Sequence, residues 1–275
     1  MCRWLAYSGS PIALETVLLQ PEHSLIDQSL HSRMGVETTN GDGFGVGWYD
    51  GGPEPCIYRS MNPAWNDQNL RELAAHIKSP LFLAHIRAST GTAIQQTNCH
   101  PFRHEKWLWM HNGSIRSFAT VKRDLMLAVD PSLFSSIAGS TDSELMFYLA
   151  LSLGLNDNPV AAVERMAGLI EETAERHGIA NPLQMSLATT NGERLWVFRY
   201  STERQSRSLY YSTHFRTLRE LYPDNARIAS VSEETRLVVS EPLVDLSGAW
   251  NEIPESHCGI VQAGQDELLP FQPKR

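Results

Sequence analysis

A tight reversal between two short apolar runs constrains the fold of this chain more than any other single feature. The runs cover residues 185–188 and 195–200, and the segment between them contains Asn191-Gly192. This dipeptide accepts the positive φ angles that a tight hairpin turn requires. The sequence therefore predicts that the two runs are strands and that they pair in antiparallel fashion.

Other segments indicate sheets that are covered by helices. Short apolar runs bounded by Gly, Pro or Asn are typical of strands, and apolar residues spaced by three and four positions are typical of helices. We expect strands at 44–49, 81–86 and 107–110, and helices around 70–77, 145–151 and 163–174. Because no internal repeat occurs, a single domain over residues 1–275 is the simplest organisation, with a loop-rich portion from about residue 240.

Composition and charge exclude several classes of partner. The 275 residues are 42% hydrophobic, and their formal net charge of -8 offers no basic surface for nucleic acid. The four cysteines form no C-x-x-C pair, which argues against a zinc knuckle or a disulfide scaffold and favours a reducing cytoplasm. No apolar stretch approaches the roughly 18 residues of a membrane span. We expect a soluble, cytoplasmic protein.

The second residue combines a nucleophile with a base. Removal of Met1 requires a small second residue, and it would leave Cys2 with a thiol and a free α-amine. An α-amine titrates at a pKa of about 7.7–8.0, so it can accept a proton near neutral pH. A thiol beside such a base becomes an activated nucleophile. Cysteine at position 2 also occurs without any catalytic role, so this hypothesis depends on the segments that follow.

Asn112 and Gly113 follow an aromatic-rich run and are suited to stabilise an oxyanion. The asparagine side-chain amide and the glycine backbone N–H are two donors of the kind that acyl-transfer sites use. An ordinary Asn-Gly turn is the alternative interpretation.

Two charged residues can hold the ends of an amino acid. Arg87 follows a predicted strand, where its planar guanidinium suits bidentate capture of an α-carboxylate, although a surface arginine paired with an acid is the alternative. Asp142 precedes a predicted helix, where it can cap the helix or bind an ammonium group. We expect His85 and His100 to be structural, and no residue spacing favours a metal site.

Taken together, these segments resemble the class-II glutamine amidotransferases of the N-terminal-nucleophile hydrolase superfamily. The similarity lies in five ordered segments: Cys2, His85–Thr90, Asn98–Pro101, His111–Gly113 and Thr141–Glu144. The segments Asn40–Trp48 and Ser240–Leu243 look like the single-domain branch, which includes the ergothioneine-pathway γ-glutamyl amidohydrolases.

This resemblance implies an α+β fold, a four-layer αββα sandwich of two antiparallel sheets between helices. It implies that Cys2 is the nucleophile, and that Asn112 and Gly113 form the oxyanion hole. The residues that it assigns to substrate binding are Arg87, Thr90, His100 and Asp142. The resemblance requires neither a cofactor nor a metal ion.

The activity expected on this basis is hydrolysis of the γ-carboxamide of glutamine or of a γ-glutamyl compound, through a γ-glutamyl thioester on Cys2. A chain of 275 residues leaves no room for a synthase domain that would consume ammonia, so we expect a stand-alone amidase. A glutaminase subunit that supplies ammonia to a partner synthase and a non-catalytic glutamine-binding regulatory module are the alternatives. Whether the chain forms a homo-oligomer stays open.

Overall fold

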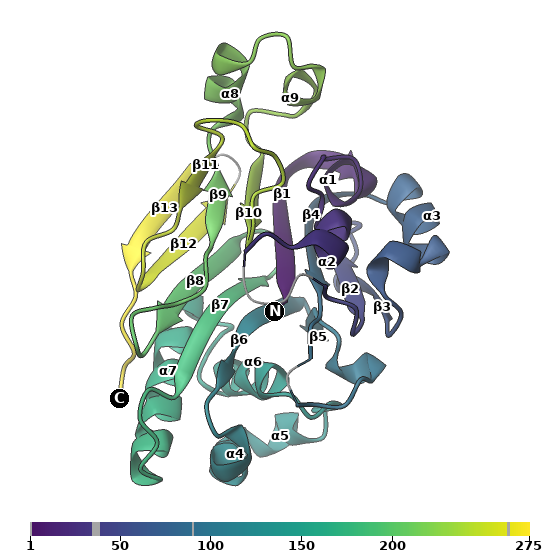
Figure 1. Ribbon diagram of the computed structural model, residues 1–275. Coiled ribbons are helices and arrows are strands. Elements are labelled where there is room, and N and C mark those ends of the chain that lie inside the picture. The colour runs from purple at the N-terminus through teal and green to yellow at the C-terminus, as the bar shows by residue number, and fades with distance from the viewer. Residues whose placement is uncertain (1, 35–38, 90, 263–264) are drawn as a thin grey trace.

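Two antiparallel sheets face each other in this computed structural model, and helices cover their outer faces (Figure 1). The structure describes residues 2–34, 39–89, 91–262 and 265–275. The predicted αββα sandwich is therefore confirmed. None of the helices within these ranges is long and apolar enough to cross a membrane.

The first sheet, sheet A, contains seven strands among the described residues. Their spatial order is β11 (Trp250–Glu252), β9 (Tyr210–Ser212), β10 (Arg236–Val239), β1 (Arg3–Ala13), β4 (Lys78–Ile86), β2 (Phe44–Trp48) and β3 (Cys56–Ser60). The second sheet, sheet B, has the order β13 (Gln265–Pro270), β12 (His257–Gln262), β8 (Leu195–Ser201), β7 (Leu183–Thr190), β6 (Trp107–Ile115) and β5 (Phe102–His104). The segment after about residue 240 thus contributes three of these strands.

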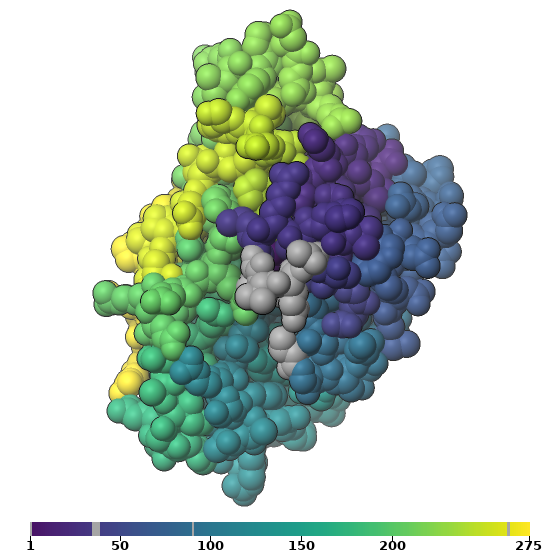
Figure 2. Space-filling model, in the orientation of Figure 1, coloured from purple at the N-terminus to yellow at the C-terminus, as the bar shows by residue number. Residues whose placement is uncertain are grey.

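Helices are distributed between the two outer faces. Those near sheet A are α1 (Glu15–Leu18), α2 (Leu25–His31), α3 (Gln68–His76), α8 (Phe215–Leu221) and α9 (Ala226–Ser230). Those near sheet B are α4 (Phe118–Leu127), α5 (Pro131–Phe134), α6 (Asp142–Ser152) and α7 (Pro159–Arg176). Two short 3-10 turns, η1 (Ala64–Asn66) and η2 (Gln96–Asn98), lie in the connections. The pair α8 and α9 projects beyond the end of the sandwich (Figures 1 and 2).

The predicted hairpin joins β7 to β8. Thr190 pairs with Leu195, and Gly192 takes a φ angle of +91° in the turn. The Asn191 side chain accepts hydrogen bonds from the N–H groups of Glu193 and Arg194, both at 3.0 Å. The positive φ angle of Gly192 and the side-chain acceptor of Asn191 therefore both stabilise the turn. The predicted antiparallel pairing of the two strands is confirmed.

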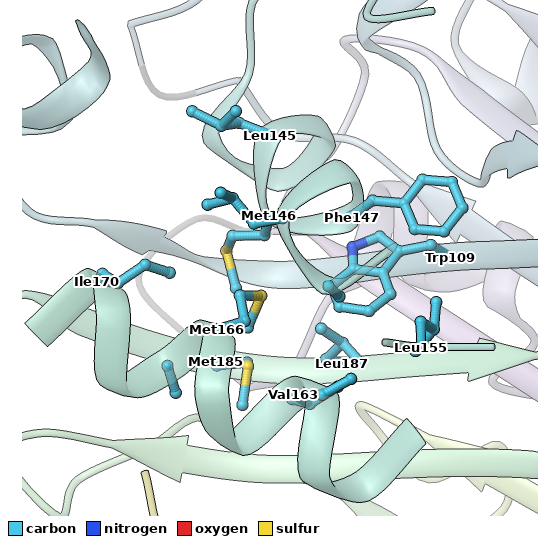
Figure 3. Packing of buried hydrophobic residues seen from close by; sticks show 14 of the residues in the cluster. Trp109, Leu145, Met146, Phe147, Leu155, Val163, Met166, Ile170, Met185 and Leu187 are labelled. Carbon is cyan, nitrogen blue, oxygen red and sulfur yellow. The ribbon is translucent and has the colours of Figure 1, made fainter. Parts of the chain in front are cut away.

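Apolar side chains fill three layers, and the layer with the most buried residues lies between sheet B and its helices. Trp109 of β6 stacks on Phe147 of α6, with ring centroids 5.5 Å apart. Figure 3 shows Met146, Met166 and Met185 meeting where α6, α7 and β7 converge. The sequence indicates an amphipathic helix here, but α6 is buried on all sides because sheet B and the neighbouring helices surround it.

The glycine-rich strand β2 packs unusually close to the segment that leads into β5. A Cβ atom on Gly45 would lie 2.3 Å from the His100 carbonyl oxygen, and one on Gly47 would lie 2.8 Å from Pro101. Glycine inside a strand often marks such a close approach of another backbone. The strand predicted at 44–49 is confirmed, and its close packing fixes one wall beside the region described next.

Candidate active site

The candidate site forms where the beginning of β1, the end of β4 and the middle of β6 meet. Arg3 pairs with Ile86 across β1 and β4 in sheet A. Asn112 of β6 reaches across from sheet B, and its side-chain amide donates a hydrogen bond to the Cys2 carbonyl oxygen at 2.9 Å. Residues 110 positions apart in the sequence are therefore in direct contact.

The Cys2 thiol is half-buried and lies against the backbone after β4. The Ala88 N–H donates to the sulfur at 3.3 Å, and the thiol faces the Ala88 carbonyl oxygen at 3.5 Å. Burial raises the pKa of the Cys2 thiol, and the Ala88 hydrogen bond and the charges of Arg87 and Arg207 lower it by less. The thiol is therefore a weak acid, and it needs a nearby base to become a nucleophile at neutral pH.

The amides of Asn112 and Gly113 remain able to bind a further acceptor. Asn112 is buried, and its NH2 group carries a second donor besides the one directed at Cys2. Arg116 N–H donates to Pro182 O at the end of the β6–β7 ladder, and hydrogen-bonded pairs alternate along such a ladder. By this alternation the Gly113 N–H points away from β7. Ile115, with the same parity, indeed donates to Asp142 instead.

Arg87 is a buried cation surrounded by neutral acceptors. Its guanidinium group donates to Ser89 Oγ at 3.1 Å, Thr92 Oγ1 at 2.7 Å and the Ala93 carbonyl oxygen at 3.2 Å. Within the described residues it has no ion-pair partner. A buried charge without a counter-ion is costly. The position therefore favours a ligand that carries a carboxylate.

Asp142 is the first residue of α6. One carboxylate oxygen accepts from the Ile115 N–H at 2.8 Å, and the other accepts from the Ser143 N–H at 2.8 Å. The helix-capping role considered for Asp142 belongs instead to Thr141, whose hydroxyl accepts from the Glu144 N–H at 3.2 Å. Thr141 has the extended backbone of a capping residue, whereas Asp142 already lies within the helix. Asp142 keeps acceptor capacity for a cationic group.

Two further residues, Thr90 and His100, are predicted to bind substrate. Thr90 lies outside the described residues. His100 is buried, and its ring stacks on His85 and Phe102, with centroids 4.1 and 4.6 Å apart. Burial lowers the pKa of His100 well below its usual range and that of His85 to about 3, so both rings are neutral. This packing agrees with the structural role expected of both histidines from their residue type.

Three residues near the site were not named from the sequence. Asp42 accepts from the Ser89 N–H at 2.7 Å, and this bond holds the loop that carries Arg87. Arg3 donates to the Cys2 carbonyl oxygen at 2.9 Å, and Glu241 binds Arg3. Asp42 and Glu241 both lie in segments that the family resemblance includes, but no local pattern connects them to Cys2.

Comparison with known proteins gives a consistent result. The family model for glutamine amidotransferases of class II matches residues 18–274. A probable glutamine amidotransferase of Saccharomyces cerevisiae, DUG3, is 33% identical over 285 residues, which cover 92% of this chain and 80% of the yeast protein. The γ-glutamyl-hercynylcysteine sulfoxide hydrolase of Mycolicibacterium smegmatis is 27% identical over 98% of this chain and all of its own length.

Solved structures show the same fold. A glutamine aminotransferase class-II domain protein from Silicibacter pomeroyi superposes with a TM-score of 0.76 and 32% identity, and the match covers all of both chains. Glutamine phosphoribosylpyrophosphate amidotransferase from B. subtilis superposes with a TM-score of 0.65 over 99% of this chain and 50% of its own. At 15% identity, this second match concerns the fold alone.

Proposed function

Because this chain is an enzyme that belongs to the class-II glutamine amidotransferases, we propose that it hydrolyses the γ-carboxamide of glutamine or of a γ-glutamyl compound through a thioester on Cys2. The observation that carries the proposal is the contact between the Asn112 amide and the Cys2 carbonyl. It brings an oxyanion donor to the nucleophile within one hydrogen bond. We further propose that residues 1–275 form a single amidotransferase domain.

Removal of Met1 begins the proposed mechanism, because it frees the α-amine of Cys2. The amine accepts the thiol proton, and the sulfur attacks the γ-carbonyl carbon. The second N–H of Asn112 and the N–H of Gly113 stabilise the tetrahedral oxyanion. The carbon–nitrogen bond then breaks, and the leaving amine takes the proton from the α-ammonium group.

The second half of the cycle repeats these steps with water. The α-amine accepts a proton from water, and the resulting hydroxide attacks the thioester carbonyl. The same two donors stabilise the second oxyanion. The carbon–sulfur bond breaks, and a glutamate-type acid leaves. The α-ammonium group then returns a proton to the thiolate. No atom is gained or lost by the enzyme over the cycle.

The two charged residues hold the head group of the substrate in this proposal. Arg87 binds the α-carboxylate, which supplies the counter-ion that the described residues do not. Asp142 binds the α-ammonium group with its remaining acceptor capacity. Holding both ends directs the γ-amide toward Cys2. Thr90 and His100 remain predictions for the same subsite.

Intact mass tests processing and the site together. The purified protein is weighed before and after treatment with 6-diazo-5-oxo-norleucine, a glutamine analogue that alkylates nucleophilic cysteines. We expect loss of Met1 and a single adduct. The adduct should be absent from Cys2→Ala and present in Cys56→Ala, whose thiol is also half-buried. Retained Met1 without an adduct would contradict the amidase and favour a glutamine-binding regulatory module.

A further inference from the structure

A nucleophile at the first position of a chain has an unusual problem of orientation. Once Met1 is removed, Cys2 is covalently tied to the protein only through Arg3. Rotations about its own backbone bonds would otherwise move both the sulfur and the α-amine. Catalysis depends on holding reacting groups to within a fraction of an ångström. The Cys2 carbonyl group is the part of the residue that the protein can bind without occupying the thiol or the α-amine.

Two side chains donate hydrogen bonds to the Cys2 carbonyl oxygen. Asn112 donates to it from sheet B at 2.9 Å, and the guanidinium group of Arg3 donates to it from sheet A, also at 2.9 Å. Arg3 is itself almost fully buried, at 2% exposure. A long, flexible side chain can hold this position only if the remainder of its guanidinium group is fixed.

Glu241 fixes it. Its carboxylate accepts from Arg3 Nε at 2.7 Å, and both side chains are 2% exposed. The same carboxylate is bound by His23 and by the N–H groups of Arg33 and Met34, at 2.8 and 3.1 Å. Burial alone would raise the pKa of Glu241, but the His23 and Arg33 hydrogen bonds and the Arg3 charge lower it below its usual value.

The chain next to Glu241 is hydrogen-bonded to β1, the strand that begins at Arg3. The Trp4 N–H donates to Ser240 Oγ at 2.9 Å, and the Ser240 N–H donates to the Trp4 carbonyl oxygen at 3.1 Å. Ser32 Oγ contacts both Arg3 and Glu241. Residues adjacent to Cys2, the segment 32–34 and the segment 240–241 therefore share one buried ionic centre.

We propose that Glu241, acting through Arg3, is a positioning residue for the nucleophile Cys2. The inference rests on the proposed function, because it concerns the geometry of the reacting thiol and α-amine. It assigns a role to the Ser240–Leu243 segment, which the mechanism above does not use. Glu241 itself does not touch substrate.

A purely structural role for this ionic centre is the competing explanation, since breaking a buried ion pair destabilises a protein. The contacts favour positioning because Arg3 binds Glu241 and Cys2 through separate nitrogens. Nε binds the Glu241 carboxylate, and Nη1 binds the Cys2 carbonyl. Rotation of the guanidinium group away from Glu241 therefore displaces its hydrogen bond to the nucleophile.

Steady-state kinetics on Glu241→Gln, Arg3→Lys and the matched control Glu164→Gln separate the two roles. Glu164 is a buried carboxylate on α7 that pairs with Lys274, behind sheet B. Removal of Met1 is first verified by intact mass. Active sites are then titrated with 6-diazo-5-oxo-norleucine, so that unfolded protein does not enter kcat. L-Glutamine is the substrate, and iodoacetamide alkylation of Cys2 is a second readout.

For both Glu241→Gln and Arg3→Lys we expect kcat per titrated site to fall at least about tenfold, with KM for glutamine within about twofold of wild type. KM should change little because Arg87 and Asp142, which hold the head group, are untouched. The rate of iodoacetamide alkylation should change in the same two variants. Glu164→Gln should lose stability but keep kcat. Lysine is the replacement chosen for Arg3 because it keeps the positive charge. Its single nitrogen cannot reproduce the separate Nε and Nη1 contacts to Glu241 and Cys2.

Unchanged kcat per titrated site in Arg3→Lys and in the folded fraction of Glu241→Gln would overturn the inference and leave a structural role. If Glu241→Gln does not fold, Arg3→Lys alone decides in the same way. Wild-type protein that neither turns over glutamine nor reacts with the analogue would instead contradict the proposed function. The two failures are therefore distinguishable.

Discussion

At the scale of single residues, Arg87 is the residue proposed to hold the α-carboxylate of the substrate. It is buried beside three neutral acceptors, and its charge has no ionic partner among residues 2–34, 39–89, 91–262 and 265–275. Hydrogen bonds to a charged group contribute about 1.5–3 kcal/mol each. A ligand carboxylate at this position would therefore account for a large part of the binding free energy.

Substitution of this arginine tests that role. We expect Arg87→Lys to raise KM for glutamine by about 10- to 100-fold with a smaller effect on kcat, because lysine keeps the charge but loses the planar fork. Arg116→Lys is the matched control, since Arg116 is exposed and pairs with Glu203. Equal kinetics for both variants would remove Arg87 from the substrate site. Initial-rate measurements over a range of glutamine concentrations suffice.

The ionisation of Glu241 makes a separate prediction about stability. Its pKa in the folded protein is lowered from the usual 4.5, so the folded state binds fewer protons than the unfolded state near that pH. The stabilisation is therefore present above pH 4.5 and is lost as pH falls through the folded pKa. We expect the difference in unfolding free energy between wild type and Glu241→Gln to shrink on acidification.

Urea denaturation at about pH 6.5 and at successively lower values measures this difference. Glu164→Gln again serves as the reference for loss of a buried carboxylate. A gap between wild type and Glu241→Gln that stays constant with pH would show that Glu241 does not ionise differently on folding.

At the scale of elements, the amino end of α6 carries Asp142, which is proposed to bind the α-ammonium group of the substrate. Thr141 caps the helix through its hydroxyl, and Asp142 follows at the first helical position. Loss of a capping hydroxyl typically costs about 1 kcal/mol. We expect Thr141→Val to lose about that much stability and to raise KM for glutamine, because Asp142 would be held less firmly. Thr141→Ser keeps the capping hydroxyl, so its stability and its KM should match those of wild type. Denaturation midpoints and glutamine kinetics provide the measurement, and a stable Thr141→Val enzyme with unchanged KM would contradict it.

Local patterns predicted eight of the described helices and strands, but not the surroundings of these elements. The Asn191-Gly192 turn determines its own hairpin because both residues act within the turn itself. The spacing of apolar residues predicted α6, but it could not show that the helix is buried all around. Burial on every side depends on sheet B and on helices distant in the sequence, which no periodicity within the helix records.

For the whole molecule, the same distinction separates the predicted site from the observed one. Cys2, Asn112 and Arg87 each lie in a recognisable segment, and their chemistry indicates a role. The pair of Arg3 and Glu241 spans 238 positions, and neither residue signals the other. A site assembled from ordered segments can be anticipated, whereas the groups that hold it in place become visible only in the folded chain.

The hydrogen bond from Asn112 to the Cys2 carbonyl oxygen can form only after the two sheets have packed together. It joins the two sheets, so neither sheet alone supplies both the thiol and the amide that is proposed to stabilise the oxyanion. A chain in which the two sheets have not yet packed together therefore lacks the arrangement that the proposed hydrolysis requires. By this proposal, only molecules in the native state would turn over glutamine.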